Sequence, residues 1–356
     1  MLTYNSTIPA TGLIHEVNPG IDRLMDIYRD LRFIYPAKME KLAAVFDLVK
    51  QNWRQALQLD FPLFQSSIVY SEATNITATA TLWQFLNNGL IGQHLASNNP
   101  VASREVFLNV LDEVITKQQE YAINSFQIFY RPQNKYPNRF FSTVSEAAGK
   151  KLSGIMKYDY FELPVITENS PGIEVIEVNE SNKKEWLDFI SKFRSSVFIA
   201  GQEYGTDDLP LNRLNQRFQE GLLTRKRQIL VAYDRNNSTV CGAIIKNNSS
   251  VGLNFSLLEN CAEIILDPVN NDALNLKIAK GLLSKMAELN SLSAPAKVYA
   301  LTDCGQHQLF TVMGGQWIRN YNLFMVLKGG YEIWYNCVNE MTSSVYQRFE
   351  TRNQPI

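Results

Sequence analysis

Residues 228–327 decide the fold of this chain. They begin with QILVAYDRNNSTVCGAIIKN and continue, after three residues, with VGLNFSLLENCAEIILDPVN and NDALNLKIAKGLLSKMAEL; AKVYALTD, GQHQLFTVMGG and YNLFMVL follow. Two β-branched runs around a polar Asn-Asn-Ser turn predict a hairpin, and a third apolar run ends at Asp267-Pro268 before a long amphipathic segment. The predicted order is therefore strand, strand, strand, helix, strand, helix, strand.

The composition limits the classes of function. The chain has 356 residues, 45% of them hydrophobic, and this length favours two domains. Its formal net charge is −1, so no basic surface points to nucleic acid as a partner. We expect a protein without a membrane span and with a cytoplasmic location, because the first 20 residues lack a basic leader with an apolar core and no run approaches the length of a membrane helix.

Cysteines and histidines are few and widely spaced. The four cysteines lie in the second half at spacings that match neither a zinc pattern nor C-x-x-C. Cys241 and Cys261 lie in apolar strand patterns, where buried thiols pack as small apolar groups, and Cys304 is interpreted as a packing residue, with a nucleophile as the alternative. The three histidines, His15, His94 and His307, show no ligand spacing. We therefore expect no metal site.

The first half of the chain repeats the order of the second. Helical patterns between residues 19 and 59 precede alternating runs at 66–72 and 76–85, a helix opened by Asn98-Asn99-Pro100, a strand, a short helix closed by Gly149, and a last strand. An offset of 163 residues places Tyr70 on Tyr233, Gly89-Leu90 on Gly252-Leu253, Tyr158 on Tyr321 and Phe161 on Phe324. This repetition predicts two copies of one unit.

A polar, Pro- and Gly-containing join at residues 166–172 separates the copies. The second copy begins with the strand pattern IEVIEV and a helix signalled by Asn179 or Ser181. A second helix follows in DDLPLNRLNQRFQEGLLTRKRQ, with its basic residues expected in the last turn. The predicted division is an N-terminal lobe at 1–165, a C-terminal lobe at 172–330 and a helical tail at 331–356.

In this order of elements the chain resembles the GNAT superfamily of N-acetyltransferases. The resemblance implies an α+β fold of two tandem lobes, each with two helices, then a mixed, mostly antiparallel sheet with two further helices. It also implies transfer of an acyl group from a pantetheine thioester, carried by acyl-CoA or an acyl carrier protein, to an amine of a small molecule or peptide. We expect the C-terminal lobe to be catalytic and the N-terminal lobe to be degenerate.

The resemblance places the acyl donor at CAEIILDP and the helix that follows. In GNAT proteins the fourth strand diverges from the fifth, and its free main-chain groups, here those of Ile265 and Leu266, hold the pantetheine. A diphosphate then lies on the start of the next helix. The usual glycine-rich loop is absent here, because no glycine lies between Pro268 and Lys280. Side chains of Asn270, Asn271, Asn275 and Lys277 are the candidate substitutes; a capped helix with a solvated lysine face is the alternative.

The catalytic candidates come from three elements. Glu263 is the candidate base, because a carboxylate inside an apolar strand is costly unless it is paired or used; a salt-bridged carboxylate is the alternative. GNAT enzymes commonly place a tyrosine as proton donor where this chain has Phe310. His307, one turn earlier, is the candidate replacement, with a surface or capping histidine as the alternative. Tyr321 is a further polar candidate, with a core ring as the alternative.

Candidates for the acceptor site are less specific. Asn254 and Glu259 lie just before the fourth strand, and Phe310 with nearby aromatic residues is consistent with an apolar acyl pocket or with an ordinary core. The missing glycines and the phenylalanine at the tyrosine position favour a second interpretation, a non-catalytic GNAT-like scaffold that binds a protein or small ligand. An unrelated α/β binding protein would require the repeat to be accidental.

Overall fold

The computed structural model describes residues 12–59, 63–168, 170–235, 239–253, 257–292 and 296–352. The strands of the first half are β1 (Ile14–Val17), β2 (Phe64–Tyr70), β3 (Thr77–Leu86), β4 (Gly89–Ser97), β5 (Ser125–Tyr130) and β6 (Ser153–Pro164). The strands of the second half are β7 (Ile173–Glu177), β8 (Arg225–Asp234), β9 (Thr239–Ser249), β10 (Ala262–Leu266), β11 (Lys297–Asp303) and β12 (Gln316–Leu327).

Helices connect and cover these strands. Those of the first half are α1 (Ile21–Asp30), α2 (Pro36–Leu42), η1 (Ala43–Val45), α3 (Phe46–Leu57), α4 (Pro100–Tyr121) and α5 (Lys135–Ala148). Those of the second half are α6 (Lys183–Phe193), α7 (Ser196–Gly201), α8 (Asn212–Glu220), η2 (Leu257–Asn260), α9 (Asp272–Leu289), α10 (His307–Val312), η3 (Lys328–Gly330) and α11 (Tyr331–Arg352). The predicted α+β class with a mixed sheet is confirmed.

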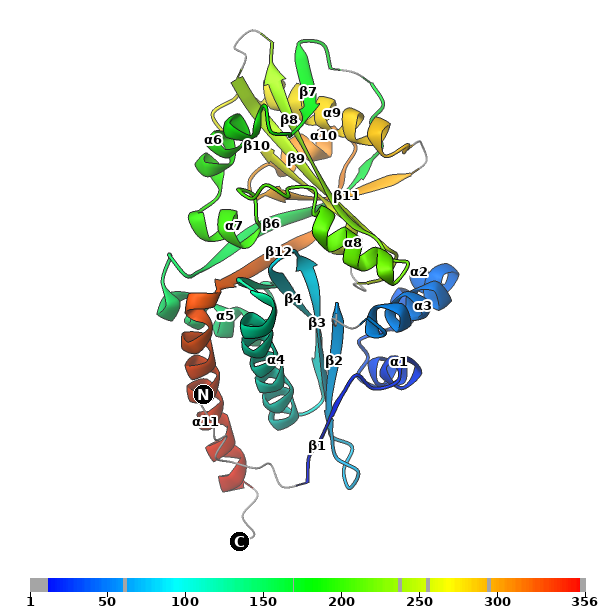
Figure 1. Ribbon diagram of the computed structural model, residues 1–356, viewed down its shortest axis with the longest axis vertical. Coiled ribbons are helices and arrows are strands. Elements are labelled where there is room, and N and C mark those ends of the chain that lie inside the picture. The colour runs from blue at the N-terminus through cyan, green and yellow to red at the C-terminus, as the bar shows by residue number, and fades with distance from the viewer. Residues whose placement is uncertain are drawn as a thin grey trace.

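All of these strands form a single sheet, and the two halves exchange their last strands. The order is β1-β2-β3-β4-β5-β12-β6-β11-β10-β9-β8-β7. Strand β12 pairs antiparallel with β5 of the first half, β6 pairs antiparallel with β11 of the second half, and β6 and β12 pair with each other. Figure 1 shows both strands crossing the middle of the molecule. We call β1–β5 with their helices lobe one, and β7–β11 with theirs lobe two.

Each exchanged strand buries a phenylalanine in the other lobe. Phe161 of β6 contacts Phe310 of α10 with ring centroids 5.5 Å apart. Phe324 of β12 contacts Phe141 of α5 at 4.6 Å. Both residues of the repeat pair, Phe161 and Phe324, are fully buried. The two lobes therefore complete each other's cores as well as each other's sheets.

The two faces of the sheet carry different helices. One face is covered by α4, α5 and α11 in lobe one and by α9 and α10 in lobe two. The other face is covered by α1 and α3 in lobe one and by α6 and α7 in lobe two. Helix α8 of lobe two also packs on lobe one, where Phe218 lies edge-on to Trp83. On β10 this alternation directs Ile264 toward α9 and Glu263 with Ile265 toward α6 and α7.

Three predictions about local structure were wrong. A short strand, β1, precedes the helices of lobe one and pairs with β2. Helix α8 ends at Glu220, and Arg225 to Arg227 lie in β8 instead of in the last helical turn. Gly89 begins β4, whereas Gly252 precedes η2, so these two residues are not equivalent in the repeat. Tyr70 and Tyr233 do occupy equivalent positions near the ends of β2 and β8.

Candidate functional site

The parallel strands β10 and β11 separate after three paired positions. Ala262, Glu263 and Ile264 pair with Ala300, Leu301 and Thr302. Beyond this point Ile265 and Leu266 keep their pairing with β9 only. Among the described strands, β10 therefore has no partner on its β11 side at these two residues, which are both buried. We call this break in the pairing the opening. An acyl thioester needs main-chain hydrogen-bond donors at this kind of opening.

Asparagine side chains cap the start of α9. Asn271 is the N-cap, and its side-chain oxygen accepts a hydrogen bond from the Leu274 amide at 2.9 Å. Asn275 is buried, and its side-chain amide donates to the main-chain carbonyl of Asp267 at 3.1 Å. The side-chain amide of Asn270 donates to the side-chain oxygen of Asn275 at 3.3 Å. The helix also begins with an acidic residue, Asp272. These contacts match the capped-helix alternative.

The side chain of Lys277 is exposed on α9. With Asn271 used as the cap and Asn275 used locally, an anion at this helix start would meet main-chain amides and the lysine side chain. Asp272 opposes an anion there, because like charges repel. The helix start therefore fits a diphosphate less well than the strand opening fits a pantetheine arm.

Thr302 marks the point where β10 and β11 separate. The residue is fully buried, and its hydroxyl has no hydrogen-bond partner within the part of the chain that the structure describes. It alternates with Leu301 and Asp303, so it lies on the α9 face of β11. A buried hydroxyl without a partner costs about 1–3 kcal/mol. A ligand amide in the opening would supply the missing partner, so this residue fits a pantetheine arm.

Glu263 lies at the centre of a buried polar network on the opposite face. Its Oε1 accepts hydrogen bonds from the Tyr158 hydroxyl at 3.0 Å and from Arg194 Nη2 at 2.8 Å and Nε at 3.1 Å. Its Oε2 accepts from the Tyr204 hydroxyl at 2.9 Å. The network holds the carboxylate in one orientation, as the salt-bridged alternative expects.

Arg194 joins Glu263 to a second carboxylate. Its Nη1 donates to Asp303 Oδ2 at 3.1 Å, and its Nη2 lies 3.0 Å from Asp303 Oδ1. The Arg194 side chain is 3% exposed and that of Asp303 is 30% exposed. Burial disfavours the charge on Arg194, but Glu263, Tyr158 and Asp303 together outweigh this effect and raise the pKa of Arg194. Burial also raises the pKa of Asp303, although Arg194 opposes the shift.

The two tyrosines of the network stay protonated. Burial raises the pKa of Tyr158 and of Tyr204 well above the usual value, and the nearby Glu263 carboxylate adds to both shifts. Each hydroxyl is therefore a hydrogen-bond donor to Glu263 across the physiological range. If Glu263 is to bind a proton, one of its present donors must turn away.

A small cavity lies beside Glu263. Its volume is about 30 Å³, which is more than the roughly 10–15 Å³ that one water molecule needs. Tyr158, Tyr204 and Glu263 of the network line it, together with Phe85 and Phe129 of lobe one. The lining also includes Cys261, whose thiol pKa burial raises to about 12.

The remaining sequence candidates lie apart from this network. His307 is an exposed first residue of α10, its ring 5.3 Å from that of Phe161. Phe310 is fully buried in the core beneath α9. Its phenyl ring has no acidic proton with which to protonate a thiolate. Tyr321 packs edge-on against Tyr160, with ring centroids 5.6 Å apart. Asn254 lies outside the described residues, and only the backbone of Glu259, in η2, is described.

The structure therefore brings Glu263 and Tyr321 to the α7 face, and Phe310 and His307 to the α9 side. Sequence reasoning missed Arg194, Tyr158, Tyr204 and Asp303. They come from four separate segments, and no spacing along the chain connects them with Glu263. The one available signal was Glu263 itself, since a carboxylate in an apolar strand requires a buried partner.

Lobe one has an equivalent opening that its own side chains fill. Strands β4 and β5 pair from Gly89 to Gly92 and then separate. A methyl group added to Gly92 would lie 2.6 Å from the ring of Phe126, so that ring covers the strand. His94 adopts a positive φ of 56° at the bulge that follows, and its ring stacks on Trp53 at 5.3 Å.

The described residues contain neither a metal-binding cluster nor a membrane-spanning helix. No cluster of His, Cys, Asp and Glu suited to a metal ion occurs among the described residues. No helix in the described part of the chain combines the length and the apolar character needed to cross a bilayer.

Comparison with known proteins finds similarity of fold only. No protein-family profile matches the sequence, and no curated protein matches it. A GCN5-related N-acetyltransferase from Sphaerobacter thermophilus superposes with a TM-score of 0.47 at 12% identity, over 89% of this chain and 96% of that one. A tandem GNAT protein from the clavulanic acid biosynthesis pathway gives 0.40 at 10% identity, over 88% and 98%. A GCN5-related N-acetyltransferase from Anabaena variabilis gives a TM-score of 0.33 at 11% identity, over 88% of this chain and 72% of that one. At these identities the similarity assigns no substrate or activity to this chain.

Proposed function

We propose that this chain is an N-acyltransferase of the GNAT type, with lobe two as the catalytic lobe and lobe one as its support. The donor is an acyl-CoA or an acyl carrier protein, and the acceptor is an amine of a small molecule or peptide. The observation that carries the proposal is the separation of β10 and β11 after Ile264, which leaves Ile265 and Leu266 without a partner on that side among the described strands, next to the buried Thr302 hydroxyl.

The main chain at the opening has two tasks in this proposal. Successive residues of a strand direct their main-chain groups to opposite edges, so one of Ile265 and Leu266 faces away from β9. The main-chain groups of that residue hold the pantetheine arm and stabilise negative charge on the reacting carbonyl oxygen. The Thr302 hydroxyl then gains a hydrogen-bond partner, which the described residues do not provide. Asn270, Asn271, Asn275 and Lys277 set the position of the α9 start, with Lys277 as the candidate phosphate contact.

Proton removal from the acceptor is assigned to the carboxylates on the other face. An amine attacks a thioester only in its neutral form, so a proton must pass to a base. Glu263 is the candidate base, and Asp303 is the more exposed carboxylate of the same network. Tyr158 and Tyr204 hold Glu263 in place and release it when it binds a proton. His307 and Tyr321 remain candidates for returning a proton to the leaving thiolate.

A non-catalytic scaffold is the second candidate. It is favoured by the saturation of Glu263, which already accepts four hydrogen bonds, and by Phe310 at the position of the usual tyrosine. In that case the opening at β10 would bind a ligand without chemistry or would bind none.

Thermal denaturation with a series of acyl-CoAs and acyl-phosphopantetheines tests the proposal. A donor at about 100 times its dissociation constant adds roughly 2.7 kcal/mol to the free energy of unfolding. The matched variant is Thr302→Val, which removes the hydroxyl and keeps the shape. We expect it to leave the free protein as stable as before, or slightly more stable, and to reduce the donor-induced shift. A wild-type protein that no donor stabilises contradicts the enzyme proposal.

A further inference from the structure

The segment from Gln202 to Leu211 closes the space beside Glu263. Gln202 and Tyr204 line the cavity next to the carboxylate, and Tyr204 donates its hydroxyl to it. A cavity of about 30 Å³ accommodates water-sized groups, but not the carbon skeleton of a molecule that carries the amine. If Glu263 serves an amine acceptor, as the proposed function requires, this cover has to move.

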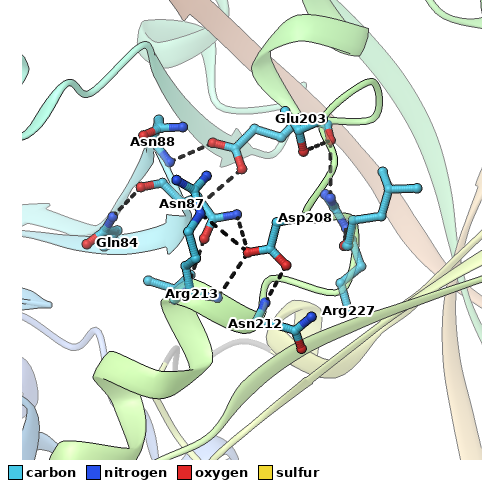
Figure 2. Close-up of polar contacts among 11 residues, drawn as sticks. Gln84, Asn87, Asn88, Glu203, Asp208, Asn212, Arg213 and Arg227 are labelled. Carbon is cyan, nitrogen blue, oxygen red and sulfur yellow. Dashed lines mark hydrogen bonds and ion pairs between the residues drawn. The ribbon is translucent and has the colours of Figure 1, made fainter. Parts of the chain in front are cut away.

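Lobe one holds the segment shut through one carboxylate. Glu203 is buried, and its Oε1 accepts a hydrogen bond from the Asn88 amide at 2.6 Å. Its Oε2 accepts from the Asn87 amide at 3.2 Å. Both amides belong to the turn between β3 and β4 of lobe one, and Figure 2 shows the carboxylate pointing at this turn. Hydrogen bonds to a charged group are about twice as strong as neutral ones.

Further contacts surround this pair. Asp208 Oδ2 accepts from the Asn87 side chain at 3.2 Å, and the Asn87 side-chain oxygen accepts from the Leu214 amide at 3.1 Å. From within lobe two, Arg227 donates to the carbonyls of Gln202 and Leu209 at 2.5 and 2.8 Å (Figure 2). The segment therefore lies between a guanidinium of its own lobe and a turn of the other lobe.

The backbone of the segment is under strain at two positions. Glu203 has φ 56° and Leu211 has φ 64°, the left-handed region that side chains other than glycine rarely adopt. At Glu203 this conformation ends α7, where main-chain hydrogen bonds from Glu203 to Ala200 at 3.1 Å and from Tyr204 to Ile199 at 3.0 Å close the helix. The contacts of the Glu203 carboxylate with Asn87 and Asn88 then fix this helix end against lobe one. Loss of those contacts frees the helix end to move, and Tyr204, the next residue, moves with it.

We propose that residues 202–211 are a gate over Glu263, and that Glu203, bound to the Asn87-Asn88 turn, is its latch. Lobe one then has a function in the reaction of lobe two: it controls the access of the acceptor to the carboxylates. Release of the latch opens Glu263 and the cavity to the acceptor, and closure of the gate keeps the acceptor away from them.

Cys261 reports on this gate, because it lines the cavity and is 4% exposed. The test uses the full chain with Cys304→Ser, which removes the exposed thiol. N-ethylmaleimide modification of Cys261 is followed by mass spectrometry in the parent, in Glu203→Gln and in Asp207→Asn. The last is the matched control, because Asp207 is in the same segment but is exposed and pairs with Lys183 of α6. Cys337, buried on the inner side of α11, reports global unfolding.

We expect Glu203→Gln to accelerate modification of Cys261 at least about tenfold, with Cys337 unchanged and with Asp207→Asn equal to the parent. Equal Cys261 rates in the two variants, or acceleration of Cys261 and Cys337 together, would overturn the latch. The labelling requires neither donor nor acceptor. A failure of the latch is therefore read separately from a failure of the proposed acyl transfer, which the donor-binding experiment reports.

Discussion

Tyr158 and Tyr321 lie directly opposite each other in the antiparallel pair of β6 and β12. They are also equivalent in the repeat, since 321 − 158 gives the offset of 163 residues. A residue that faces its own repeat equivalent lies on the local two-fold axis, so the axis that relates the exchanged strands passes between these tyrosines. Their surroundings differ: the Tyr158 hydroxyl donates to Glu263, whereas the Tyr321 ring packs against Tyr160 and Phe129.

This difference predicts an asymmetric pair of variants. Tyr158→Phe removes one donor to a buried carboxylate and should lower the free energy of unfolding by about 1.5–3 kcal/mol. Tyr321→Phe, the symmetry-related control, should change it by less than about 0.5 kcal/mol. Urea denaturation measures both. Equal losses in the two variants would mean that the Glu263 contact contributes nothing specific.

Strand exchange predicts that the lobes unfold together. Phe161→Ala and Phe324→Ala each remove a buried ring from the other lobe's core and should each cost about 3–5 kcal/mol. We expect a single calorimetric transition in the wild type and in both variants, shifted as a whole. Two separated transitions in either variant would show that the lobes are independent folding units.

The contact of Gly252 in lobe two with Trp53 and Val49 in lobe one predicts a compensating pair of variants. Trp53 Nε1 donates to the Gly252 carbonyl at 2.6 Å, and a methyl group on Gly252 would lie 2.1 Å from Val49. Gly252 also has φ 76°. Gly252→Ala should therefore destabilise the protein by roughly 2–4 kcal/mol through overpacking and backbone strain. Adding Val49→Ala should recover part of the loss, as a double-mutant cycle measures. Strictly additive losses would contradict the contact.

The buried tyrosines predict a loss of stability at alkaline pH. Burial raises the pKa of Tyr158 and Tyr204 in the folded chain, while the unfolded chain titrates near the ordinary value of about 10. Above that pH the unfolded state loses protons that the folded state retains, so stability that is complete below about pH 10 falls as the pH rises. Each tyrosine contributes a slope of up to about 1.4 kcal/mol per pH unit.

The measurement is the free energy of unfolding against pH from neutral to alkaline values. Tyr204→Phe should flatten the decline above pH 10 in proportion to one group, with Tyr321→Phe again as the control. A decline that is as steep in Tyr204→Phe as in the wild type would show that this hydroxyl ionises in the folded chain.

The sequence predicted what depends on local patterns. Helix α4 begins at Pro100 with Asn99 as its cap, because the side chain of Asn99 accepts from the amides of Val101 and Ala102. Strand β10 also ends at Leu266, as the apolar run before Asp267 predicted. Such features follow from residues a few positions apart.

The exchange of β6 and β12 could not be predicted in this way. Both strands have an apolar pattern that satisfies either lobe, and only packing over long sequence distances selects the partner, as Phe161 does with Phe310. The division at residues 165–172 therefore separates the sequence copies but not the two halves of the sheet. Arg194 was missed for a related reason, because the end of α6 gives no sign that its guanidinium reaches two carboxylates.

Binding of the acyl donor in the opening between β10 and β11 can be measured by amide hydrogen exchange during titration with acyl-CoA or acyl-phosphopantetheine. Saturating donor should slow exchange at Ile265, Leu266 and the first turn of α9, and Thr302→Val should weaken this protection at equal donor concentration. Unchanged exchange in these residues with every donor, at any acyl length, would contradict it.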